Sequence, residues 1–199
     1  KSNLSRTVLF QKSDIGKNKA EIAAKRTKEL SLYDNTNIDW FHGDLVWDLG
    51  SGIYGEMDIV LGCLDNTEAR FAVNRFCHLT GTPWIDAGIY ALTGSVSVYS
   101  SKPQSPCYEC GATKEQMISK RKRYSCDDFK RSMFKDGIMP TVQITSSIVS
   151  AIQVQEAIKI LCGQEASTNK KIYFEGKTNY LDVIPLTYRQ DCYAHAVYP

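Results

Sequence analysis

Apolar positions along the chain fall into two patterns, one typical of helices and one typical of buried strands. Residues 141–161 place isoleucine and valine at helical spacing, and Gly163 follows as a stop signal. Residues 57–63 and 83–87 are short apolar runs, which are typical of strands buried on both faces of a parallel sheet. Because strands of this kind alternate with helical segments, the pattern predicts an α/β layer fold.

The remaining elements are predicted from weaker patterns and from capping and turn signals. Two further helices are expected, over residues 16–30 with Asp14 as a cap, and over residues 68–80 after the capping residues 65–67. The other expected strands are residues 36–48 with a turn at 43–44, residues 94–99, and a closing hairpin over residues 171–174 and 179–184.

Size and charge exclude several classes of protein. The chain has 199 residues, which suits one domain or one domain with a small appendage. Its net charge of +2 and pI near 8.1 give no general attraction to nucleic acid or to an anionic membrane. No run of about 18 apolar residues is present, and residues 1–6 lack the apolar core of a signal peptide. We therefore expect no membrane span, and the charge disfavours a nucleic-acid partner.

The cysteines indicate a metal site. The chain contains seven, and Cys107 and Cys110 are spaced C-x-x-C, which favours zinc ligands and free thiols in a reducing, cytoplasmic setting over disulfides. Two thiolates on a tight turn suit two corners of a tetrahedral zinc site, and Cys192 with His195 is the best candidate for the other two. A single C-x-x-C pair can also be redox-active, so both interpretations stay open on the residues alone. The remaining candidates for core thiols are Cys63, Cys77 and Cys162.

Three charged residues have the chemistry of a nucleotide site. Asp65 follows a predicted strand, where open α/β sheets bind ligands, and a carboxylate there can hold Mg²⁺ against phosphate oxygens. Arg6 can clamp a phosphate with its planar fork, and Lys19 can add a point charge. Each has an ordinary alternative when taken singly: Asp65 would cap the next helix, and the two cations would be solvated surface charges.

Together with their neighbours, these residues resemble the motifs of the ThiF/MoeB family and of the adenylation domains of ubiquitin-activating enzymes. The matching motifs are Asn3-Leu4-Ser5-Arg6, Gly16-x-x-Lys19, Cys63-Leu64-Asp65-Asn66, Phe71–Asn74 with Pro83–Gly88, Gly94–Val98 and Gln153–Lys159. Thr7 stands where the family usually has glutamine. The resemblance covers almost the whole chain, and the ordered set is much more specific than any single motif.

The resemblance implies a Rossmann-like nucleotide-binding fold with a largely parallel sheet, extended by antiparallel strands and braced by zinc. It makes Asn3, Arg6 and Lys19 contacts to the ATP phosphates, and it makes Asp65 the carboxylate that binds Mg²⁺. The implied reaction is ATP-dependent adenylation of the C-terminal glycine of a ubiquitin-like or sulfur-carrier protein. It also favours zinc at the four cysteine and histidine ligands, although the family's second pair is usually another C-x-x-C.

In the resembling family, the segment at residues 112–139 crosses over the active site and can carry a cysteine that takes the activated acyl group. Cys126 is the candidate here, and the basic residues at 120–123 would lower its pKa. The alternative is a plain exposed thiol beside a solvated run of charges. The resemblance further implies a homodimer and a partner protein that conjugates the carrier or donates sulfur to it.

The family's first strand, glycine-rich phosphate loop and ribose-binding acid are expected before Lys1. The chain is therefore predicted to be one adenylation domain over residues 1–199 that is incomplete at its N-terminus, with zinc ligands in a C-terminal hairpin region over residues 171–195. Two alternatives stay open: a non-catalytic scaffold half of an activating pair, and adenylation of a tRNA base or a peptide. A dinucleotide oxidoreductase is supported only by the α/β pattern and explains neither the cysteine pair nor Asp65.

Overall fold

The computed structural model describes residues 7–112 and 143–197, and it divides the chain into two compact units, Lys1–Asp44 and Leu45–Pro199. Each unit is described by itself below. Among the described residues, no helix combines the length and the apolar character that crossing a membrane requires.

The first unit is built around one helix, α1 (Lys19–Leu30), which follows a short 3-10 turn, η2 (Lys12–Asp14). The Asn18 side chain caps α1 by accepting hydrogen bonds from the backbone N–H groups of Ala20 and Glu21. The prediction that Asp14 would cap this helix was wrong, because its carboxylate pairs with Arg26 of α1 at 2.6 Å instead.

The strand predicted over residues 36–48 is also wrong, since the structure has only turns and irregular backbone there. This stretch contains one asparagine and three aspartates, whose short polar side chains bond to nearby backbone and favour turns over a sheet.

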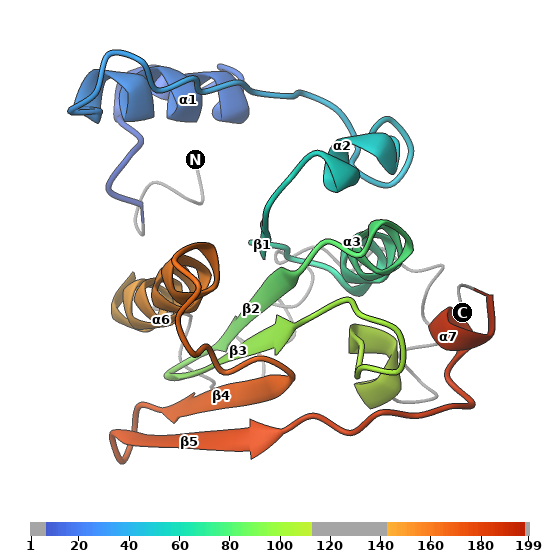
Figure 1. Ribbon diagram of the computed structural model, residues 1–199. Coiled ribbons are helices and arrows are strands. Elements are labelled where there is room, and N and C mark those ends of the chain that lie inside the picture. Colours follow the sequence, from blue (N-terminus) through green and yellow to red (C-terminus); the bar gives the residue numbers. More distant parts are fainter. Residues whose placement is uncertain (1–6, 113–142, 198–199) are drawn as a thin grey trace. The chain divides into compact units, whose positions relative to one another are not determined.

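The second unit contains one mixed five-stranded sheet, which confirms the predicted α/β class (Figure 1). Its strands lie in sequence order: β1 (Val60–Gly62), β2 (Trp84–Tyr90), β3 (Thr93–Tyr99), β4 (Lys170–Glu175) and β5 (Tyr180–Pro185). β1 and β2 are parallel, and the other neighbours are antiparallel. The parallel pair matters for the site, because its register places Gly62 beside Asp86 at the carboxyl end of β1.

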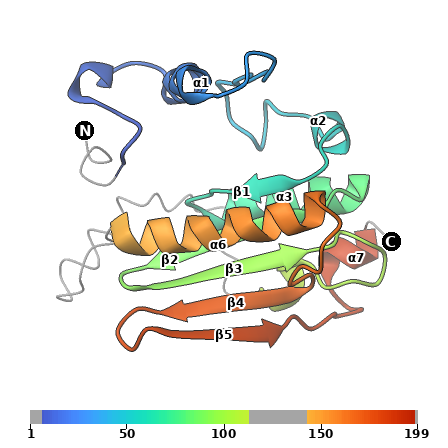
Figure 2. The same ribbon diagram turned by 60° about the vertical axis from the view of Figure 1, so that its left-hand side comes forward.

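Two long helices cover opposite faces of this sheet, as Figure 2 shows for α6 in front and α3 behind. α6 (Gln143–Leu161) packs on one face, and its core contacts include Val149 and Ala157. α3 (Thr67–Thr80) packs on the other face with the short helix α2 (Gly52–Gly55), around the buried Trp84. The alternation of side chains along β2 explains the division: Ile85 faces α6, whereas Trp84 faces α3.

A glycine sets the close approach of α6 to the sheet. A Cβ atom added at Gly94 of β3 would overlap the side chain of Val149 of α6. Gly94 therefore has a packing role. Because it lacks a side chain, α6 lies close to the sheet, and polar side chains of α6 can reach the backbone of the strands.

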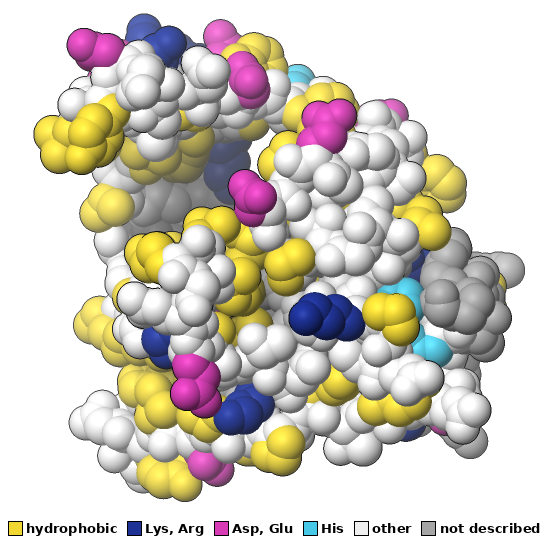
Figure 3. Space-filling model, viewed as in Figure 1, with side chains coloured by type: hydrophobic (Ala, Val, Ile, Leu, Met, Phe, Trp, Pro, Cys, Tyr) yellow, Lys and Arg dark blue, Asp and Glu magenta, His cyan; other side chains and the backbone are white. Residues whose placement is uncertain are grey.

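Apolar side chains also remain on the surface of the second unit. In Figure 3 they gather over α6 and β5. The exposed ones on these two elements include Ile144, Val154, Ile158, Leu161, Tyr180, Leu181, Val183 and Ile184.

The prediction of three core thiols was right for one of them. Cys77 of α3 is fully buried, but Cys63 and Cys162 are exposed. The two exposed thiols lie just past the ends of their elements, β1 and α6, where the chain leaves the packed layer.

Candidate functional site

Asp65 lies in the loop that joins the carboxyl end of β1 to the start of α3. Asn66 caps α3 by accepting a hydrogen bond from the N–H of Ala69 at 2.8 Å. The Asn66 amide also donates to the Asp65 carboxylate at 3.1 Å, and the Asp65 side chain itself is exposed. The capping task therefore belongs to Asn66, and it leaves the carboxylate of Asp65 open to solvent.

Arg70 of α3 supports this loop from one face of the sheet. Its Nε lies 3.0 Å from both carboxylate oxygens of Asp86 in β2. Its Nη2 donates to the carbonyls of Leu64 at 2.7 Å and Ala87 at 3.1 Å. Burial disfavours the charged guanidinium, but the Asp86 carboxylate outweighs this effect and raises the pKa of Arg70, so the side chain stays a cation.

Gln153 of α6 supports the end of β1 and the adjoining part of β2 from the other face. Its amide nitrogen donates to the carbonyls of Gly62 at 3.1 Å and Ile85 at 2.8 Å, and only 2% of the residue is exposed. The Cys63 thiol lies 3.8 Å from its amide oxygen. The backbone on both sides of Cys63 is therefore tied to side chains from α3 and α6.

Lys19 is the first residue of α1, in the first unit, and its side chain is exposed. It lines an open hollow of about 660 Å³ together with Lys17, Asn18, Phe41 and His42. Amide groups at a helix N-terminus and lysine side chains both favour anions, so the hollow has the polarity of a phosphate site.

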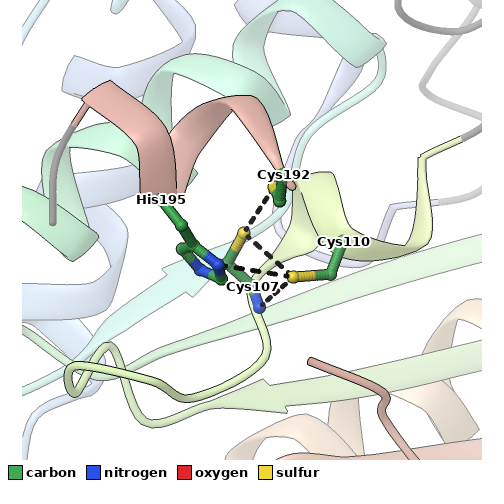
Figure 4. A group of neighbouring side chains, drawn as sticks. All are labelled: Cys107, Cys110, Cys192 and His195. Carbon is green, nitrogen blue, oxygen red and sulfur yellow. Dashed lines mark hydrogen bonds between the residues drawn. The ribbon is translucent and has the colours of Figure 1, made fainter. Parts of the chain in front are cut away.

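The four predicted metal ligands lie together in the second unit (Figure 4). Cys107 and Cys110 belong to the 3-10 turn η3 (Tyr108–Gly111) and its cap, whereas Cys192 precedes and His195 lies within the short helix α7 (Tyr193–Val197). Their ligand atoms all fall within 4.8 Å of one another. The chain thus brings residues that are far apart in sequence into one buried cluster, here called the Cys/His cluster.

The distances in the Cys/His cluster fit a tetrahedral metal. The Cys107 Sγ lies 3.7 Å from the Sγ of Cys110 and 3.7 Å from the Sγ of Cys192. Zinc bound at about 2.3 Å to each thiolate would separate two sulfurs by about 3.8 Å. A disulfide needs a bond of about 2.0 Å, so these sulfurs are thiols rather than a cystine.

His195 completes the cluster with its ring. Nδ1 lies 3.9 Å from the Sγ of Cys110 and 3.1 Å from the carbonyl oxygen of Arg189. Nε2 is buried and has no hydrogen-bond partner among the described residues. The ring stacks on Tyr188, with centroids 4.8 Å apart. The imidazole is therefore held in place while a nitrogen faces the thiols.

The electrostatics of the cluster already favour one thiolate. A hydrogen bond from the Cys107 thiol, helped by backbone N–H donors, lowers the pKa of Cys110 to about 5 against the opposing effect of burial. Donating that hydrogen bond to Cys110, together with burial, raises the pKa of Cys107. Burial raises the pKa of Cys192. Without a cation the three thiols do not ionise together, which is what a metal would change.

Residues to which the sequence analysis assigned no role hold the cluster. Arg75 of α3 binds the fully buried carboxylate of Glu109, with Nε–Oε1 at 2.7 Å and Nη2–Oε2 at 3.2 Å. Its guanidinium also lies 5.0 Å from the ring centroid of Tyr193 in α7. Asn74 accepts a hydrogen bond from the N–H of Tyr108 in the same turn. α3 therefore contacts both halves of the cluster.

Three predicted site residues, Asn3, Arg6 and Cys126, lie outside the described residues. Lys19 and Asp65 belong to different units, and the four members of the Cys/His cluster belong to one. Among the supporting residues, Asn74 and Gln153 lie in motifs that carry the family resemblance but had no assigned role, whereas Arg70 and Arg75 were not singled out.

Comparison with known proteins decides the family. A family model described as "ThiF family" matches residues 1–194. The chain belongs to the ThiF family. A ThiF-family relative, the sulfur carrier protein ThiS adenylyltransferase of Escherichia coli (strain K12), is 25% identical over 191 residues, which cover 96% of this chain and 70% of that protein.

A second relative, SUMO-activating enzyme subunit 2 of Dictyostelium discoideum, is 38% identical over 110 residues, which cover 55% of this chain and 16% of that protein. Among solved structures, E. coli MccB with ATP has a TM-score of 0.69 and 20% identity, over 97% of this chain and 55% of that chain. At that identity the likeness shows the fold. The ThiF-family chain thus spans about half of the MccB structure.

Proposed function

We propose that this ThiF-family chain is an adenylation domain that activates the C-terminal glycine of a ubiquitin-like or sulfur-carrier protein with ATP. The observation that carries the proposal is the exposed carboxylate of Asp65 at the carboxyl end of β1, on a loop held from both sides. Ligands of open α/β sheets bind at such strand ends. The names of two relatives, a ThiS adenylyltransferase and a SUMO-activating subunit, support a carrier protein of this class.

Asp65 is the residue we assign to Mg²⁺. Magnesium typically takes one or two protein carboxylates together with phosphate oxygens, and a single exposed carboxylate suits that coordination. When bound, Mg²⁺ would neutralise charge on the triphosphate. Lys19 would contact ATP phosphate from α1, and the family motifs assign the same task to Asn3 and Arg6.

The reaction is a displacement at phosphorus. An oxygen of the carrier's terminal carboxylate bonds to the α-phosphorus of ATP, the bond from that phosphorus to the bridging oxygen of the β-phosphate breaks, and pyrophosphate leaves. The product is a mixed anhydride between the carrier and AMP. The task of the protein is to hold both anions in line and to offset their charge, which positioned cations and fixed dipoles do best.

We propose that zinc occupies the Cys/His cluster, with Cys107, Cys110, Cys192 and His195 as its ligands. The set of donors and the separations of the sulfurs support this assignment. Four protein ligands leave no open position, so the zinc would be structural and would tie η3 to α7.

Other parts of the proposal follow the family resemblance. Cys126, in the crossover segment over residues 112–139, is proposed to receive the acyl group after adenylation. A homodimer, a cytoplasmic setting and a downstream conjugating or sulfur-donating partner complete the proposal. The thiol-rich composition fits a reducing compartment.

Exchange of labelled pyrophosphate into ATP tests the proposed function. The protein, expressed from its complete coding sequence, is mixed with Mg²⁺, ATP and a ubiquitin-like protein that ends in Gly-Gly. We expect exchange with this carrier and none with the same carrier lacking its last two glycines. Asp65→Asn should lower the exchange rate by about 10²–10³-fold, the size of effect seen when one group that stabilises transition-state charge is removed.

Asp58 provides the matched control. It is an exposed aspartate just before β1, at the opposite end of the strand from Asp65. Asp58→Asn removes the same charge and should leave exchange within about twofold of wild type, because surface changes of this kind have small effects. Two results would contradict the proposal: pyrophosphate exchange at the same rate with the carrier that lacks its last two glycines, or an equal loss of exchange in Asp65→Asn and Asp58→Asn.

A further inference from the structure

We infer that Arg70 and Gln153 are positioning residues that fix the Asp65 loop from the two faces of the sheet. The inference rests on the proposed function of Asp65. It explains how the exposed side chain of Asp65, which lies on a loop, is held in a fixed position.

The first step is the arrangement of main-chain acceptors. β1 ends at Gly62 and its pairing with β2 stops there, although β2 continues to Tyr90. Carbonyl groups near this point need other partners, because a buried unpaired carbonyl is costly. Four such carbonyls flank the loop, two from each strand region, and side chains satisfy them: Gly62, Leu64, Ile85 and Ala87.

The second step is the division of those carbonyls between two helices. Arg70 of α3 binds the carbonyls of Leu64 and Ala87 with a single nitrogen, Nη2. Gln153 of α6 binds the carbonyls of Gly62 and Ile85 with its amide nitrogen. Each side chain thus joins the β1 end to β2, and each does so from its own face of the sheet.

The third step is rigidity. Nε of Arg70 lies at 3.0 Å from both oxygens of Asp86, and the guanidinium is planar, so the position of Nη2 is fixed relative to β2. Gln153 is almost fully buried, with its side chain enclosed between α6 and the sheet. The main chain one residue before Asp65 is therefore held directly, by the bond to the Leu64 carbonyl.

The consequence is a separation of tasks between neighbours. Asp65 is free to bind a metal–nucleotide because it makes no structural ion pair among those found in the described residues. Its placement is supplied by Arg70 and Gln153, which reach it only through the backbone. Such supporting residues typically change metal affinity by 10–100-fold when they are removed.

The test uses two variants, each of which removes the paired hydrogen bonds of one positioning residue to main-chain carbonyls while keeping another property of its side chain. Arg70→Lys keeps the positive charge beside Asp86 but loses the fork. Gln153→Met keeps the length of the side chain but loses both donors. For each we expect amide deuterium uptake in residues 62–66 to rise at least tenfold in rate, and Mn²⁺ affinity in the presence of ATP to weaken by about 10–100-fold.

Each variant has a matched control on its own helix. Arg75→Lys changes another arginine of α3 that also pairs with a buried carboxylate, and Glu156→Gln changes another buried polar residue of α6, which accepts from Ser167 N–H and Lys159. Both controls should leave deuterium uptake in residues 62–66 unchanged. A rise that is equal in the controls would overturn the inference, because it would report general loosening of the helices.

Deuterium uptake is measured without any catalytic turnover. The positioning role and the proposed function can therefore be contradicted separately. Unchanged uptake and unchanged Mn²⁺ affinity in Arg70→Lys and Gln153→Met would overturn the positioning role, even if the wild-type protein adenylates a carrier. Failure of the wild type to exchange pyrophosphate with any carrier would overturn the proposed function, whatever the loop does.

Discussion

α3 carries two arginine–carboxylate pairs, and they support two different kinds of site. Arg70 pairs with Asp86 and holds main-chain carbonyls beside Asp65, whose own side chain is exposed. Arg75, further along α3, pairs with Glu109 inside the turn that carries two buried thiols. The same pairing chemistry therefore fixes a backbone at one place and encloses a set of ligands at the other.

The difference follows from what each site is proposed to hold. A nucleotide must enter and leave, so its carboxylate stays open and only the backbone beneath it is fixed. A structural metal stays, so its ligands can be buried and closed. Variants that disturb the Asp65 site without the Cys/His cluster, or the cluster without the Asp65 site, test this difference.

The largest expected effect comes from opening the closed site. Cys192 is fully buried, and Cys192→Ala removes one proposed zinc ligand. We expect zinc content to fall from about one per chain to near zero, and the free energy of unfolding to fall by more than about 4 kcal/mol, since metal loss is among the most damaging changes. Elemental analysis and urea denaturation measure the two quantities.

Cys162→Ala is the control for this change, because that thiol is exposed beyond the end of α6. It should retain zinc and stability. Full zinc content in Cys192→Ala would show that the cluster is not the metal site.

A smaller effect is expected from breaking the pair that supports the cluster. Arg75→Leu leaves the carboxylate of Glu109 buried without its cation, which should destabilise the fold by about 1–3 kcal/mol; the estimate is below that for a fully buried pair because 27% of the Arg75 side chain is exposed.

The double variant Arg75→Leu/Glu109→Leu should recover most of this loss, because it removes both charges. Urea denaturation of the wild type, both single variants and the double variant gives the coupling energy. Additive losses would mean that the two side chains act independently.

The smallest expected effect concerns thiols outside the cluster. Burial raises the pKa of Cys77 to about 12 from its ordinary value of 9.0. At pH 8 its thiolate fraction is then on the order of 10³-fold below that of an ordinary thiol, and alkylation should be slower by at least that factor. Mass spectrometry of alkylated peptides should show Cys162 modified first, since it is exposed. Cys63 should follow more slowly, because burial of its sulfur raises the pKa of that thiol.

The raised pKa of Cys77 also predicts how the stability of the protein changes with pH. Because the folded pKa of Cys77 is raised, its contribution is fully present below about pH 9 and is lost as the pH rises through about 12. Alkaline unfolding curves of wild type and Cys77→Ala should therefore converge over that range. Rapid alkylation of Cys77 in the folded protein would contradict its burial against the sheet.

Much of the second unit could be predicted from its spacing of apolar residues. The observed α3, β2 and β3 begin and end within a few residues of the expected ranges, because continuous apolar runs and helical spacing leave few alternatives. Residues 36–48 misled the prediction because scattered aromatic residues there have no sheet partner in the structure.

The site was predictable where residue type and spacing carry chemistry. The Cys107 and Cys192 pairs could be found because thiol and imidazole ligands recur at short intervals in metal sites. Arg70 was not found, and Gln153 was found only as part of a family-like motif without a role, because their partners are backbone carbonyls, whose positions depend on how helices pack on the sheet. Residues that react or bind ligands are therefore easier to predict from the sequence than residues that hold them in place.

The most direct test of this division is to measure adenylate formation and metal content in one sample of Asp65→Asn. Intact mass spectrometry detects the carrier–AMP anhydride, and elemental analysis of the same protein measures zinc. We predict that the anhydride is lost while zinc content and Tm match those of the wild type. An undiminished yield of anhydride, or loss of zinc together with activity, would contradict the assignment of chemistry to Asp65 and of structure to the Cys/His cluster.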